Sequence, residues 1–577
     1  MKQGLEDKEN HLLSFVLAIA AGLAVFIFNA HVTGPTIQPD EASYLATAAA
    51  IAGYQNDFAS NFYGGYSILI APAFLIAETP SDIWSVVRAI NATLFASSVF
   101  ALCLLAKYFS PTSTLRQRYA AVGVVSLYPA WVIMAGYSSA QVAFVPVFLF
   151  MLLTYLRAIH GGLGIWLILG VLSGVLFWVH PTGIASIIAI VCSAFYVASV
   201  RNKYNVFVVF LLVIICMVFI YLGGMSWLLQ EKMSISGLEP NHEYPSVEQF
   251  FSPLTSMSGI KEMVARIAGQ VFYVSLGSVG LLGVGLYSLI PDLKAGVDAF
   301  NKTVLQERAV AIFIWFALMG TIMITALVFT AKPESMRLDE WIHGRYIEGV
   351  LAPIILAGVL NMSGKKILWT IPIAIFCTWV LYSEIDSYDH TLRVNISALW
   401  QDYYIHEQGV WGWLAAGIMV ILVVAIVPRS VGLIVITAIF SFSGYLHITS
   451  HIDSSVGVKL RWAEALRIRE QFAPGTCVGF DYSGVDNYNK YVFWKDFSFI
   501  LYDYQLKRMS HAAWMKNCNG PLFSYSEKVN SLGDNIHLAG VTPLGGPMVW
   551  EKGDLAKNVG FTKESLAQST KNHTYFP

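Results

Sequence analysis

The chain alternates long apolar stretches with short polar loops, and this alternation predicts a bundle of membrane-spanning helices. A helix needs roughly 17–25 apolar residues to cross the hydrocarbon core of a bilayer. About thirteen stretches meet this requirement, and they lie near residues 12–30, 84–106, 119–137, 140–156, 163–179, 182–200, 205–229, 267–290, 309–330, 347–362, 367–383, 410–427 and 431–449. The first stretch is longer than the roughly 7–15 residues of a signal-peptide core, so we expect it to be retained as a helix.

Composition supports a membrane protein rather than a soluble one. Hydrophobic residues make up 56% of the 577 residues, charged residues make up 13%, and the mean hydropathy is +0.58. Soluble proteins carry roughly 25% charged residues, so this much apolar surface requires the bilayer as its solvent. The formal net charge is −1 and the chain has no basic block, which argues against a nucleic-acid partner.

Positive charge is concentrated in one set of loops, and this predicts the orientation in the membrane. Short loops rich in Lys and Arg remain in the cytoplasm. The residues concerned are Lys2, Lys8, Lys107, Arg116, Arg118, Arg157, Arg201, Lys203, Lys294, Lys302, Arg308, Lys365, Lys366 and Arg429. We therefore expect a cytoplasmic N-terminus and, because the number of spans is odd, a C-terminus on the outer side.

The composition changes near residue 451, which predicts two domains. Residues 1–450 form the expected transmembrane domain, and residues 451–577 are more polar and form a small extracytoplasmic α/β domain. The polar part shows patterns of helices at 459–472 and 488–510 and of strands near 477–482, 521–525, 537–541 and 547–551. Cys477 and Cys518 lie in this domain, where an oxidising compartment favours a disulfide; the alternative is two unpaired thiols. The predicted fold class is mainly α, with interfacial helices and this appended domain.

Candidate chemistry begins in the first outer segment, residues 33–77, which contains no Lys or Arg. Asp40 and Glu41 open an apolar pattern at 40–53 that is too short to span and predicts an interfacial helix. A partly dehydrated carboxylate is a suitable base for taking a proton from a hydroxyl group. Adjacent helical residues point about 100° apart, so we expect one acid to act and the other to orient a neighbour or bind a divalent metal. The alternative is that both acids only cap the helix.

A second cluster, His343-Gly344-Arg345-Tyr346, lies at the outer mouth of the tenth predicted span. Arg pairs with phosphate through bidentate, charge-assisted hydrogen bonds. His343 can donate a hydrogen bond to a phosphate or act as an acid, and Gly344 permits a close backbone approach. The alternative is that the Arg and the Tyr are anchors at the membrane interface.

Further residues on the outer side complete the candidate set. Arg88 and Lys332 are cations that could also bind a phosphate, and Arg88 lies inside a span, where its charge needs a partner. The candidates for acceptor or sugar binding are Tyr44, Tyr63, Tyr66 and His180. The alternatives are that the tyrosines belong to an interfacial aromatic belt and that His180 is structural.

Several of these segments, in their order, resemble a known family. One span is followed by an acidic pair leading a short helix, then by NFYGGYSILIAPAF and by VVRAINATLFASSVFALCLLAKYF. This order resembles the start of GT-C glycosyltransferases, which include lipid A aminoarabinose transferases, protein O-mannosyltransferases and arabinofuranosyltransferases. The resemblance implies a polyprenyl-phosphate sugar donor and an acid in the first outer loop that activates the acceptor, a position that Asp40 matches. The HGRY cluster resembles the donor-phosphate region of several members.

The chain departs from this family in its second outer loop. Many members place a second acid there, whereas residues 138–141 of this chain read SSAQ. The departure favours a mechanism with one main base and electrostatic help from His and Arg, and it leaves metal dependence open.

We therefore predict a membrane glycosyltransferase that moves a sugar from a polyprenyl-phosphate donor to a glycan, lipid or protein. The reaction is expected on the outer face of the bacterial cytoplasmic membrane, and the HGRY cluster favours arabinofuranose as the sugar. The sequence contains no Walker-type phosphate loop, as expected for a lipid-linked rather than a nucleotide donor. The alternatives are a secondary transporter or flippase of a lipid-linked sugar and a polymerase or ligase of whole glycans.

Overall fold

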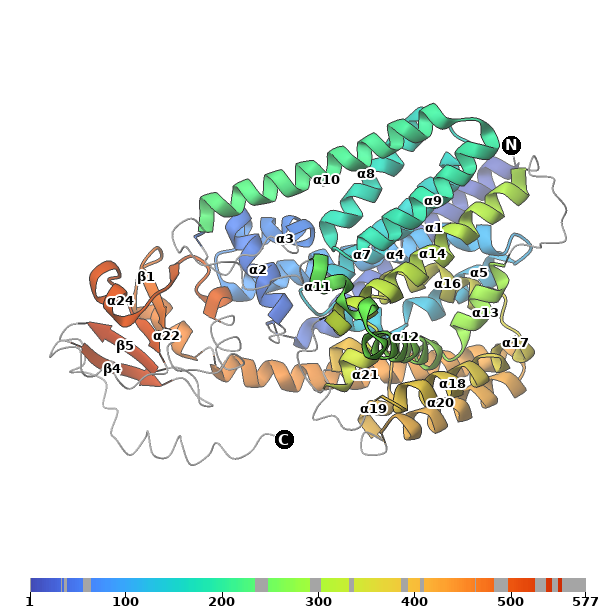
Figure 1. The fold of residues 1–577 in the computed structure, drawn as a ribbon. Coiled ribbons are helices and arrows are strands. Elements are labelled where there is room, and N and C mark those ends of the chain that lie inside the picture. The colour runs from blue at the N-terminus through green and yellow to red at the C-terminus, as the bar shows by residue number, and fades with distance from the viewer. Residues whose placement is uncertain are drawn as a thin grey trace.

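A computed structural model shows a bundle of helices with a small sheet at one end (Figure 1). The structure describes residues 2–32, 34–35, 39–55, 64–233, 247–290, 302–331, 337–384, 393–404, 409–461, 463–481, 497–524, 536–541 and 548–552. Its first helices are α1 (Lys2–Phe28), η1 (Asn29–His31), α2 (Pro39–Ile51), α3 (Gly64–Ile76), α4 (Pro80–Phe109), α5 (Leu115–Ser126), α6 (Pro129–Met134), α7 (Ala140–Ala158), α8 (Leu163–Val179), α9 (Gly183–Arg201) and α10 (Tyr204–Met233). The later ones are α11 (Val247–Phe251), η3 (Ser252–Thr255), α12 (Met257–Gly277), α13 (Leu281–Ser288), α14 (Lys302–Ala331), α15 (Leu338–Trp341), α16 (Glu348–Leu360), α17 (Gly364–Leu368), α18 (Thr370–Tyr382), η4 (Arg393–Ile396), α19 (Gln401–Tyr404), α20 (Gly409–Ile426), α21 (Arg429–Arg461), α22 (Ala463–Gln471) and α24 (His511–Asn517).

All thirteen predicted spans fall on helical segments, but not all of them are single long helices. Within the described residues, nine helical segments are long and apolar enough to cross a membrane, and they belong to α1, α4, α7, α9, α10, α14, α17–α18, α20 and α21. The other four predicted spans are the shorter α8 and α16, the broken α5–α6, and the pair α12 and α13, which is bent by 100°. The prediction of a polytopic α-helical membrane protein is therefore confirmed.

Two predicted spans are interrupted for identifiable backbone reasons. Between α12 and α13, Val279 and Gly280 have φ values of 53° and 78°, and a right-handed helix cannot continue through left-handed residues. Between α5 and α6 the break falls just before Pro129, which has no N–H to donate and clashes with a preceding turn. Hydropathy did not reveal either break, because the residues on both sides of it are apolar.

The first outer segment folds into the two short helices α2 and α3; α2 is mostly buried in the protein, whereas α3 has one exposed apolar face that includes Leu75 and Ile76. Residues of α2 such as Tyr44, Leu45 and Ala48 are at most 1% exposed. The hydroxyl group of Ser67, on α3, donates to the backbone carbonyl of Tyr44 at 2.9 Å. In Figure 1, α2 and α3 lie between the helical bundle and the C-terminal sheet. The acidic pair at the start of α2 is therefore held by protein on several sides.

The C-terminal part contains the strands β1 (Cys477–Asp481), β2 (Gln505–Arg508), β3 (Leu522–Ser524), β4 (Ile536–Val541) and β5 (Met548–Lys552). They form one sheet in the order β2-β1-β3-β5-β4, with β1 parallel to β2 and β3 and with β5 antiparallel to β3 and β4. Cys477 and Cys518 form a disulfide. The helix predicted over 488–510 is wrong at its end, because residues 505–508 pair with β1 as a strand; residues 482–496 lie outside the described part.

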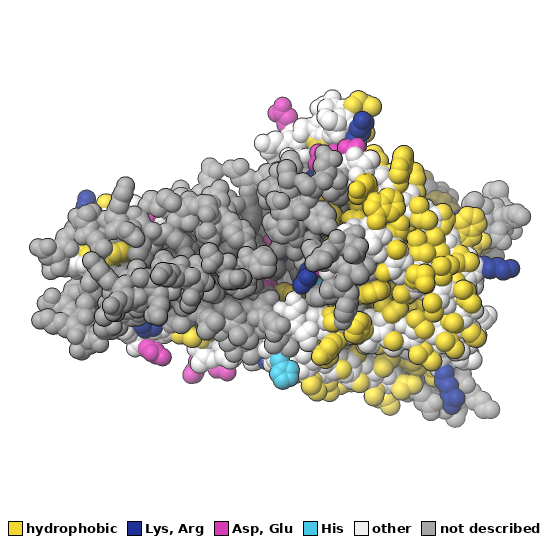
Figure 2. Space-filling model, turned by 90° about the horizontal axis from the view of Figure 1, so that it is seen from below, with side chains coloured by type: hydrophobic (Ala, Val, Ile, Leu, Met, Phe, Trp, Pro, Cys, Tyr) yellow, Lys and Arg dark blue, Asp and Glu magenta, His cyan; other side chains and the backbone are white. Residues whose placement is uncertain are grey.

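The outer surface of the helical bundle is apolar. Figure 2 shows hydrophobic side chains gathered over the helical part of the molecule on one face. Trp369 is 73% exposed, Phe376 is 60% exposed and Ile426 is 80% exposed, as expected for side chains that face lipid rather than water. The N-terminus and the sheet lie at opposite ends of the bundle in Figure 1. These features define an integral membrane protein.

Candidate functional site

The first turn of α2 and the turn before α16 meet at an ion pair. Asp40 Oδ2 lies 2.8 Å from Arg345 Nη1, with the Arg345 side chain 6% exposed and the Asp40 side chain 22% exposed. The two residues are far apart in the sequence, and each belongs to one of the two clusters singled out there. The structure thus brings the predicted base and the predicted phosphate ligand into direct contact.

The loop that precedes α7 provides further contacts to the guanidinium group. Arg345 Nε donates to Gln141 Oε1 at 3.4 Å, and Nη2 donates to Ser139 Oγ at 3.5 Å. The hydroxyl group of Ser139 in turn donates to Gln141 Oε1. Neutral oxygen atoms of Ser139 and Gln141, at the start of α7, therefore face Arg345. Sequence reasoning noted the missing acid but did not assign Ser139 or Gln141 to the site.

Asp40 and Glu41 face different partners, as the geometry of adjacent helical residues requires. Glu41 is 1% exposed, and its Oε1 accepts a hydrogen bond from the backbone N–H of Ser138 at 2.8 Å. A carboxylate that accepts a backbone N–H in a buried site fixes the position of that backbone. Glu41 therefore holds the loop before α7 against α2, whereas Asp40 faces Arg345.

The backbone of the HGRY turn is held by hydrogen bonds and close contacts with buried residues. The N–H groups of Gly344 and Arg345 donate to the carbonyl of Asn395 at 2.9 and 3.2 Å, and the Asn395 amide donates to Asp339 Oδ2 at 2.7 Å. A Cβ atom on Gly344 would lie 1.9 Å from the ring of Tyr273, so the turn requires glycine for close approach. These contacts fix the point from which the Arg345 side chain leaves the backbone.

Aromatic rings form a layer beside the ion pair. The His343 ring lies 4.7 Å from Phe329 and 4.4 Å from Tyr346, and the Tyr346 ring lies 5.0 Å from His180. His343 is 3% exposed, and its Nδ1 has no hydrogen-bond partner in the described part of the chain. A buried polar atom without a partner costs free energy, so this position favours a ligand or a water molecule beside His343.

Both histidines are neutral in the folded protein. Burial, with help from Arg345 and Arg337, lowers the pKa of His343 well below its ordinary value. Burial, and then Arg345, lowers the pKa of His180 to about 3. The backbone N–H of Thr182 donates to His180 Nδ1 at 3.2 Å, so the single ring proton of His180 is on Nε2. The histidines can therefore serve as neutral hydrogen-bonding groups rather than as cations.

The remaining predicted residues have different surroundings. Tyr44 and Tyr66 are fully buried and pack edge to face with ring centroids 5.2 Å apart, so neither ring offers a face to a sugar in this structure. Burial, followed by the charge of Asp40, raises the pKa of Tyr44. Arg88 donates to the Asn29 carbonyl at 2.9 Å and to Ser85 Oγ at 3.4 Å, which are contacts at the junction of α1 and α4. Lys332 and Tyr63 lie outside the described residues.

No cluster of three or more His, Cys, Asp or Glu side chains that could hold a metal ion occurs among the residues described. The structure therefore assigns no set of metal ligands.

Two hollows lie among the helices of the bundle. A small cavity of about 20 Å³ among α4 to α7 is lined in part by Phe95, Ser126, Trp131 and Gln141. A groove of about 1080 Å³, including its open part, lies between α1, α4, α5, α6 and α21 and shares Phe95 and Ser126 with the cavity. Apart from a few hydroxyl groups its lining is apolar. Gln141, which lines the cavity, also accepts a hydrogen bond from Arg345.

Comparison with known proteins identifies the fold. No protein-family model matches the chain, and no curated protein matches it. Among solved structures it is similar to ArnT from Cupriavidus metallidurans bound to undecaprenyl phosphate, with 12% identity, coverage of 93% of this chain and 97% of that chain, and a TM-score of 0.53. The apo structure of the same ArnT gives 13% identity, the same coverage and a TM-score of 0.52. The chain is thus a polytopic helical membrane protein whose fold is similar to that of ArnT.

Proposed function

We propose that this protein is a glycosyltransferase that uses a polyprenyl-phosphate sugar donor. The observation that carries the proposal is the Asp40–Arg345 ion pair, which places a carboxylate and a phosphate-binding side chain 2.8 Å apart. Glycosyl transfer needs a base at the acceptor hydroxyl group and positive charge at the leaving phosphate. The ArnT fold supports this reading, because that protein was crystallised with undecaprenyl phosphate.

Arg345 would bind the phosphate of the donor. Its hydrogen bonds to Gln141 and Ser139 are long, at 3.4 and 3.5 Å, so phosphate oxygens can replace them at little cost. Charge-assisted bonds to a phosphate are shorter and roughly twice as strong as neutral ones. Phosphate binding would also compete with Asp40 for the guanidinium group, and would thereby release the carboxylate only when the donor is present.

His343 and His180 would add hydrogen bonds to this phosphate. Both rings are neutral because burial lowers their pKa values, so each ring carries one N–H. Neutral donors contribute direction without adding a proton that could be lost to the substrate. The unpaired Nδ1 of His343 supports a ligand at this position.

In the proposed reaction Asp40 takes the proton of the acceptor hydroxyl group. The oxygen of that group forms a bond to the anomeric carbon of the sugar, and the bond from this carbon to the phosphate oxygen breaks. The electron pair of the broken bond remains on the phosphate, where Arg345 stabilises the charge. The products are a glycoside and a polyprenyl phosphate.

The apolar groove would take part of the isoprenoid chain. It has a volume of about 1080 Å³ and is lined by side chains such as Leu17, Val25 and Phe440. Phe95 and Ser126 line both the groove and the small cavity that Gln141 also lines. An apolar chain lying there would bring its phosphate towards Arg345.

The finer parts of the proposal concern the sugar, the compartment and the domains. We propose arabinofuranose as the sugar and a glycan, lipid or protein as the acceptor, because the HGRY cluster resembles that of arabinofuranosyltransferase-like members. The site would face the periplasm from the bacterial inner membrane, with the N-terminus in the cytoplasm. Residues 1–450 would form the catalytic membrane domain and residues 451–577 a periplasmic domain. The disulfide Cys477–Cys518 supports an oxidising compartment for the second domain.

Replacing the base while keeping its shape tests the proposal. Envelope glycans are compared by mass spectrometry between cells that carry the wild-type chain, Asp40→Asn, or Asp82→Asn. Asp82 is an exposed acid that also starts a helix, where it accepts from Thr79 Oγ1 at 2.7 Å, so it is a matched control. We expect Asp40→Asn to lower the amount of transferred sugar by a factor of about 10²–10⁴, the usual contribution of a general base.

Three results would contradict the proposal. Full transfer by Asp40→Asn would remove this residue as the base. Accumulation of a labelled lipid-linked sugar across sealed vesicles, with no new covalent product, would instead identify a transporter or flippase. Products longer by many sugars would identify a polymerase or ligase.

A further inference from the structure

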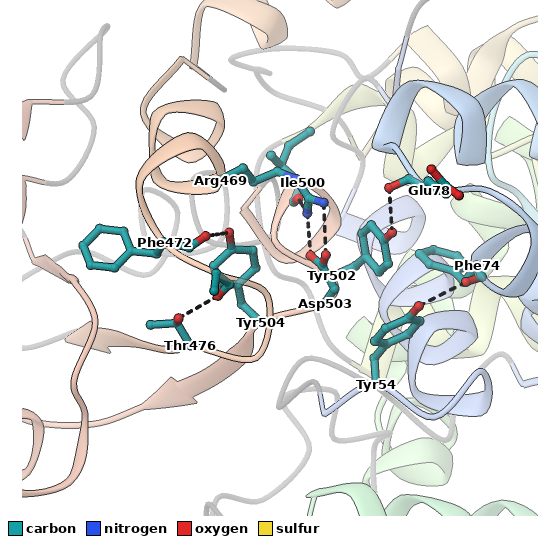
Figure 3. Close-up of polar contacts among 11 residues, drawn as sticks. Tyr54, Phe74, Glu78, Arg469, Phe472, Thr476, Ile500, Tyr502, Asp503 and Tyr504 are labelled. Atoms are coloured by element: carbon teal, nitrogen blue, oxygen red, sulfur yellow. Dashed lines mark hydrogen bonds and ion pairs between the residues drawn. The ribbon is translucent and has the colours of Figure 1, made fainter.

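A short strip of the C-terminal domain, residues 499–502, packs against the membrane domain beside α2 (Figure 3). The Tyr502 ring makes edge-to-face contacts with Tyr54 and Phe74, with ring centroids 5.0 and 5.4 Å apart. The Tyr502 hydroxyl group donates to the backbone carbonyl of Glu78 at 3.2 Å. One buried residue of the outer domain thus contacts the residues that follow α2 and the end of α3.

The same strip also contacts Trp84 on α4, which in turn bonds to the chain before α2. Phe499 packs edge to face with Trp84 at 6.4 Å, and the indole N–H of Trp84 donates to the backbone carbonyl of Val32 at 2.9 Å. Phe499, Trp84 and Val32 are at most 2% exposed. The strip is therefore linked to both ends of the segment that carries Asp40, directly at Tyr54 and through Trp84 at Val32.

Tyr54 is attached firmly to the end of α2. The N–H of Tyr54 donates to the carbonyl of Ala49, and the N–H of Gly53 donates to the carbonyl of Ala50, both at 3.0 Å. Gly53 has a φ of 106°. This pair of bonds with a left-handed glycine is a Schellman cap, which fixes the residue after the glycine to the last turn. A shift of Tyr54 is therefore transmitted to α2 as a unit.

The strip is also held firmly within its own domain. Arg469, on α22, donates to Asp503 through Nη1 at 2.5 Å and Nη2 at 3.0 Å, and its Nη1 donates to the carbonyl of Ile500 at 2.8 Å (Figure 3). The N–H of Gly475 donates to the carbonyl of Asp503 at 2.8 Å. A surface fixed on both sides can determine the position of the helix that packs against it.

We propose that the C-terminal domain is part of the catalytic unit, because the strip 499–502 sets the position of α2 and thereby of Asp40. Tyr502 and Phe499 are positioning residues in this arrangement, and their catalytic effect rests on the function proposed above. A misplacement of about 1 Å at a reacting group can cost on the order of 10²-fold in rate. Contacts that fix the end of α2 at Tyr54 therefore matter even though they lie away from the ion pair.

Two phenol deletions in the same domain provide a matched test. Tyr502→Phe removes a hydrogen bond that crosses to the membrane domain, at Glu78. Tyr504→Phe removes a hydrogen bond of the same kind, to the carbonyl of Phe472 at 2.6 Å, that stays within the C-terminal domain. Tyr502→Ala removes the ring contacts as well. Thermal unfolding of each purified full-length variant shows whether it is folded, and Tyr502→Phe decides the test if Tyr502→Ala does not fold.

The first measurement is hydrogen–deuterium exchange and needs no substrate. We expect the amides of residues 39–55 to exchange several-fold faster in Tyr502→Ala, less so in Tyr502→Phe, and at the wild-type rate in Tyr504→Phe, because opening of α2 follows the loss of its support. Unchanged exchange over 39–55 in both Tyr502 variants would overturn the inference, whatever the enzyme does.

The second measurement is sugar transfer. We expect Tyr502→Ala to lower kcat on the order of 10-fold with little change in KM for the donor, since Arg345 is untouched. When Asp40→Asn is already present, Tyr502→Ala should cause no further loss, because the two act through one group. Additive losses would show that Tyr502 does not act through Asp40. Faster exchange without any transferase activity would leave the coupling intact and refute only the proposed function.

Discussion

Two carboxyl groups near the HGRY turn, those of Asp40 and Glu348, are stabilised in opposite ways. Asp40, 22% exposed, pairs with the guanidinium group of Arg345 at 2.8 Å. Glu348 is fully buried, and its Oε1 accepts hydrogen bonds from the hydroxyl groups of Tyr273 and, at 3.2 Å, of Tyr128. Within the described part of the chain Glu348 makes no ion pair.

This difference distinguishes the carboxyl group of Asp40, which can take part in a reaction, from that of Glu348, which supports the structure around it. A partly exposed ion pair can exchange its partner for a charged ligand, whereas a fully buried carboxyl group bonded to two phenols has no such route. Glu348 begins α16 directly after the HGRY turn, and Tyr273 links the two, because its ring fills the space under Gly344 and its hydroxyl group accepts from the N–H of Ala398 at 3.2 Å. The cluster of Glu348, Tyr273 and Tyr128, here called the Glu348 cluster, thus supports the turn that carries Arg345.

The largest effect is expected at the ion pair itself. Arg345→Ala should weaken binding of undecaprenyl phosphate about 10²-fold, or about 2.7 kcal/mol, because the bidentate charge-assisted bonds are lost. Native mass spectrometry of the protein in nanodiscs measures this affinity. Arg467→Ala removes an ion pair with Glu551 in the C-terminal domain (3.2 Å) and should leave the affinity unchanged. Equal affinities for wild type and Arg345→Ala would show that Arg345 does not hold the phosphate.

A smaller effect is expected at Gly344, where the HGRY turn packs against Tyr273 of the Glu348 cluster. Gly344→Ala would place a Cβ atom 1.9 Å from the Tyr273 ring, and that ring is held by its own hydrogen bonds. Overpacking of this kind costs about 1–3 kcal/mol, so the unfolding temperature and the transfer rate should both fall. Gly223→Ala is the matched control, because its Cβ would meet nothing within 4 Å. If Gly344→Ala were as stable and as active as wild type, the contact between Gly344 and Tyr273 would not be needed to support the HGRY turn.

The histidine layer predicts a pH effect on stability. Burial lowers the pKa of His180 to about 3 and also lowers the pKa of His343. At a pH below about 6.5, the ordinary pKa of histidine, these two histidines therefore bind protons in the unfolded chain but not in the folded protein. Stability present at neutral pH is therefore lost as the pH falls below about 6.5, by about 1.4 kcal/mol per histidine at pH 5.5. Unfolding midpoints at pH 7.5 and 5.5 measure the loss, which His180→Gln combined with His343→Gln should reduce. An unchanged pH dependence in this double variant would contradict the neutral rings.

The smallest effect is expected at Glu348. Glu348→Gln keeps an oxygen acceptor for both phenols, so stability should change by less than about 1 kcal/mol, whereas Glu348→Ala leaves both hydroxyl groups without this acceptor and should cost about 1–3 kcal/mol. Denaturant unfolding compares the two. If Glu348→Gln instead abolished transfer while remaining folded, Glu348 would be an acting group like Asp40, and the contrast between the two carboxyl groups would fail.

Much of the fold was predictable, because its signals are local. Apolar length identified every helical span, and the change of composition near residue 451 anticipated a second region containing a sheet. The failures have local causes that hydropathy does not register. Val279 and Gly280 bend one predicted span through their backbone angles, and residues 505–508 became a strand because β1 lies beside them, a contact that no local pattern could show.

Less of the candidate site was predictable. Asp40, Glu41, His343 and Arg345 were recognisable as unusual polar residues next to apolar spans. Gln141, Ser139, Asn395 and Tyr273 were not assigned, because their roles depend on partners more than fifty residues away in sequence. The placement of Arg88 against Asn29 and the enclosure of the Tyr44 and Tyr66 rings could not be foreseen for the same reason.

The amino-acid sequence alone determined that this chain lies in a membrane, where its helices are, and which charged residues stand out, because hydrophobicity and charge are properties of each residue and its near neighbours. Only the tertiary structure decided that Asp40 faces Arg345, that Glu41 instead holds the loop before α7, and that Tyr502 of the strip 499–502 packs against Tyr54 after α2. Those outcomes depend on how distant helices pack. Their energies come from close contact between side chains that are far apart in the sequence, so local patterns of hydrophobicity and charge do not reveal which surfaces will meet.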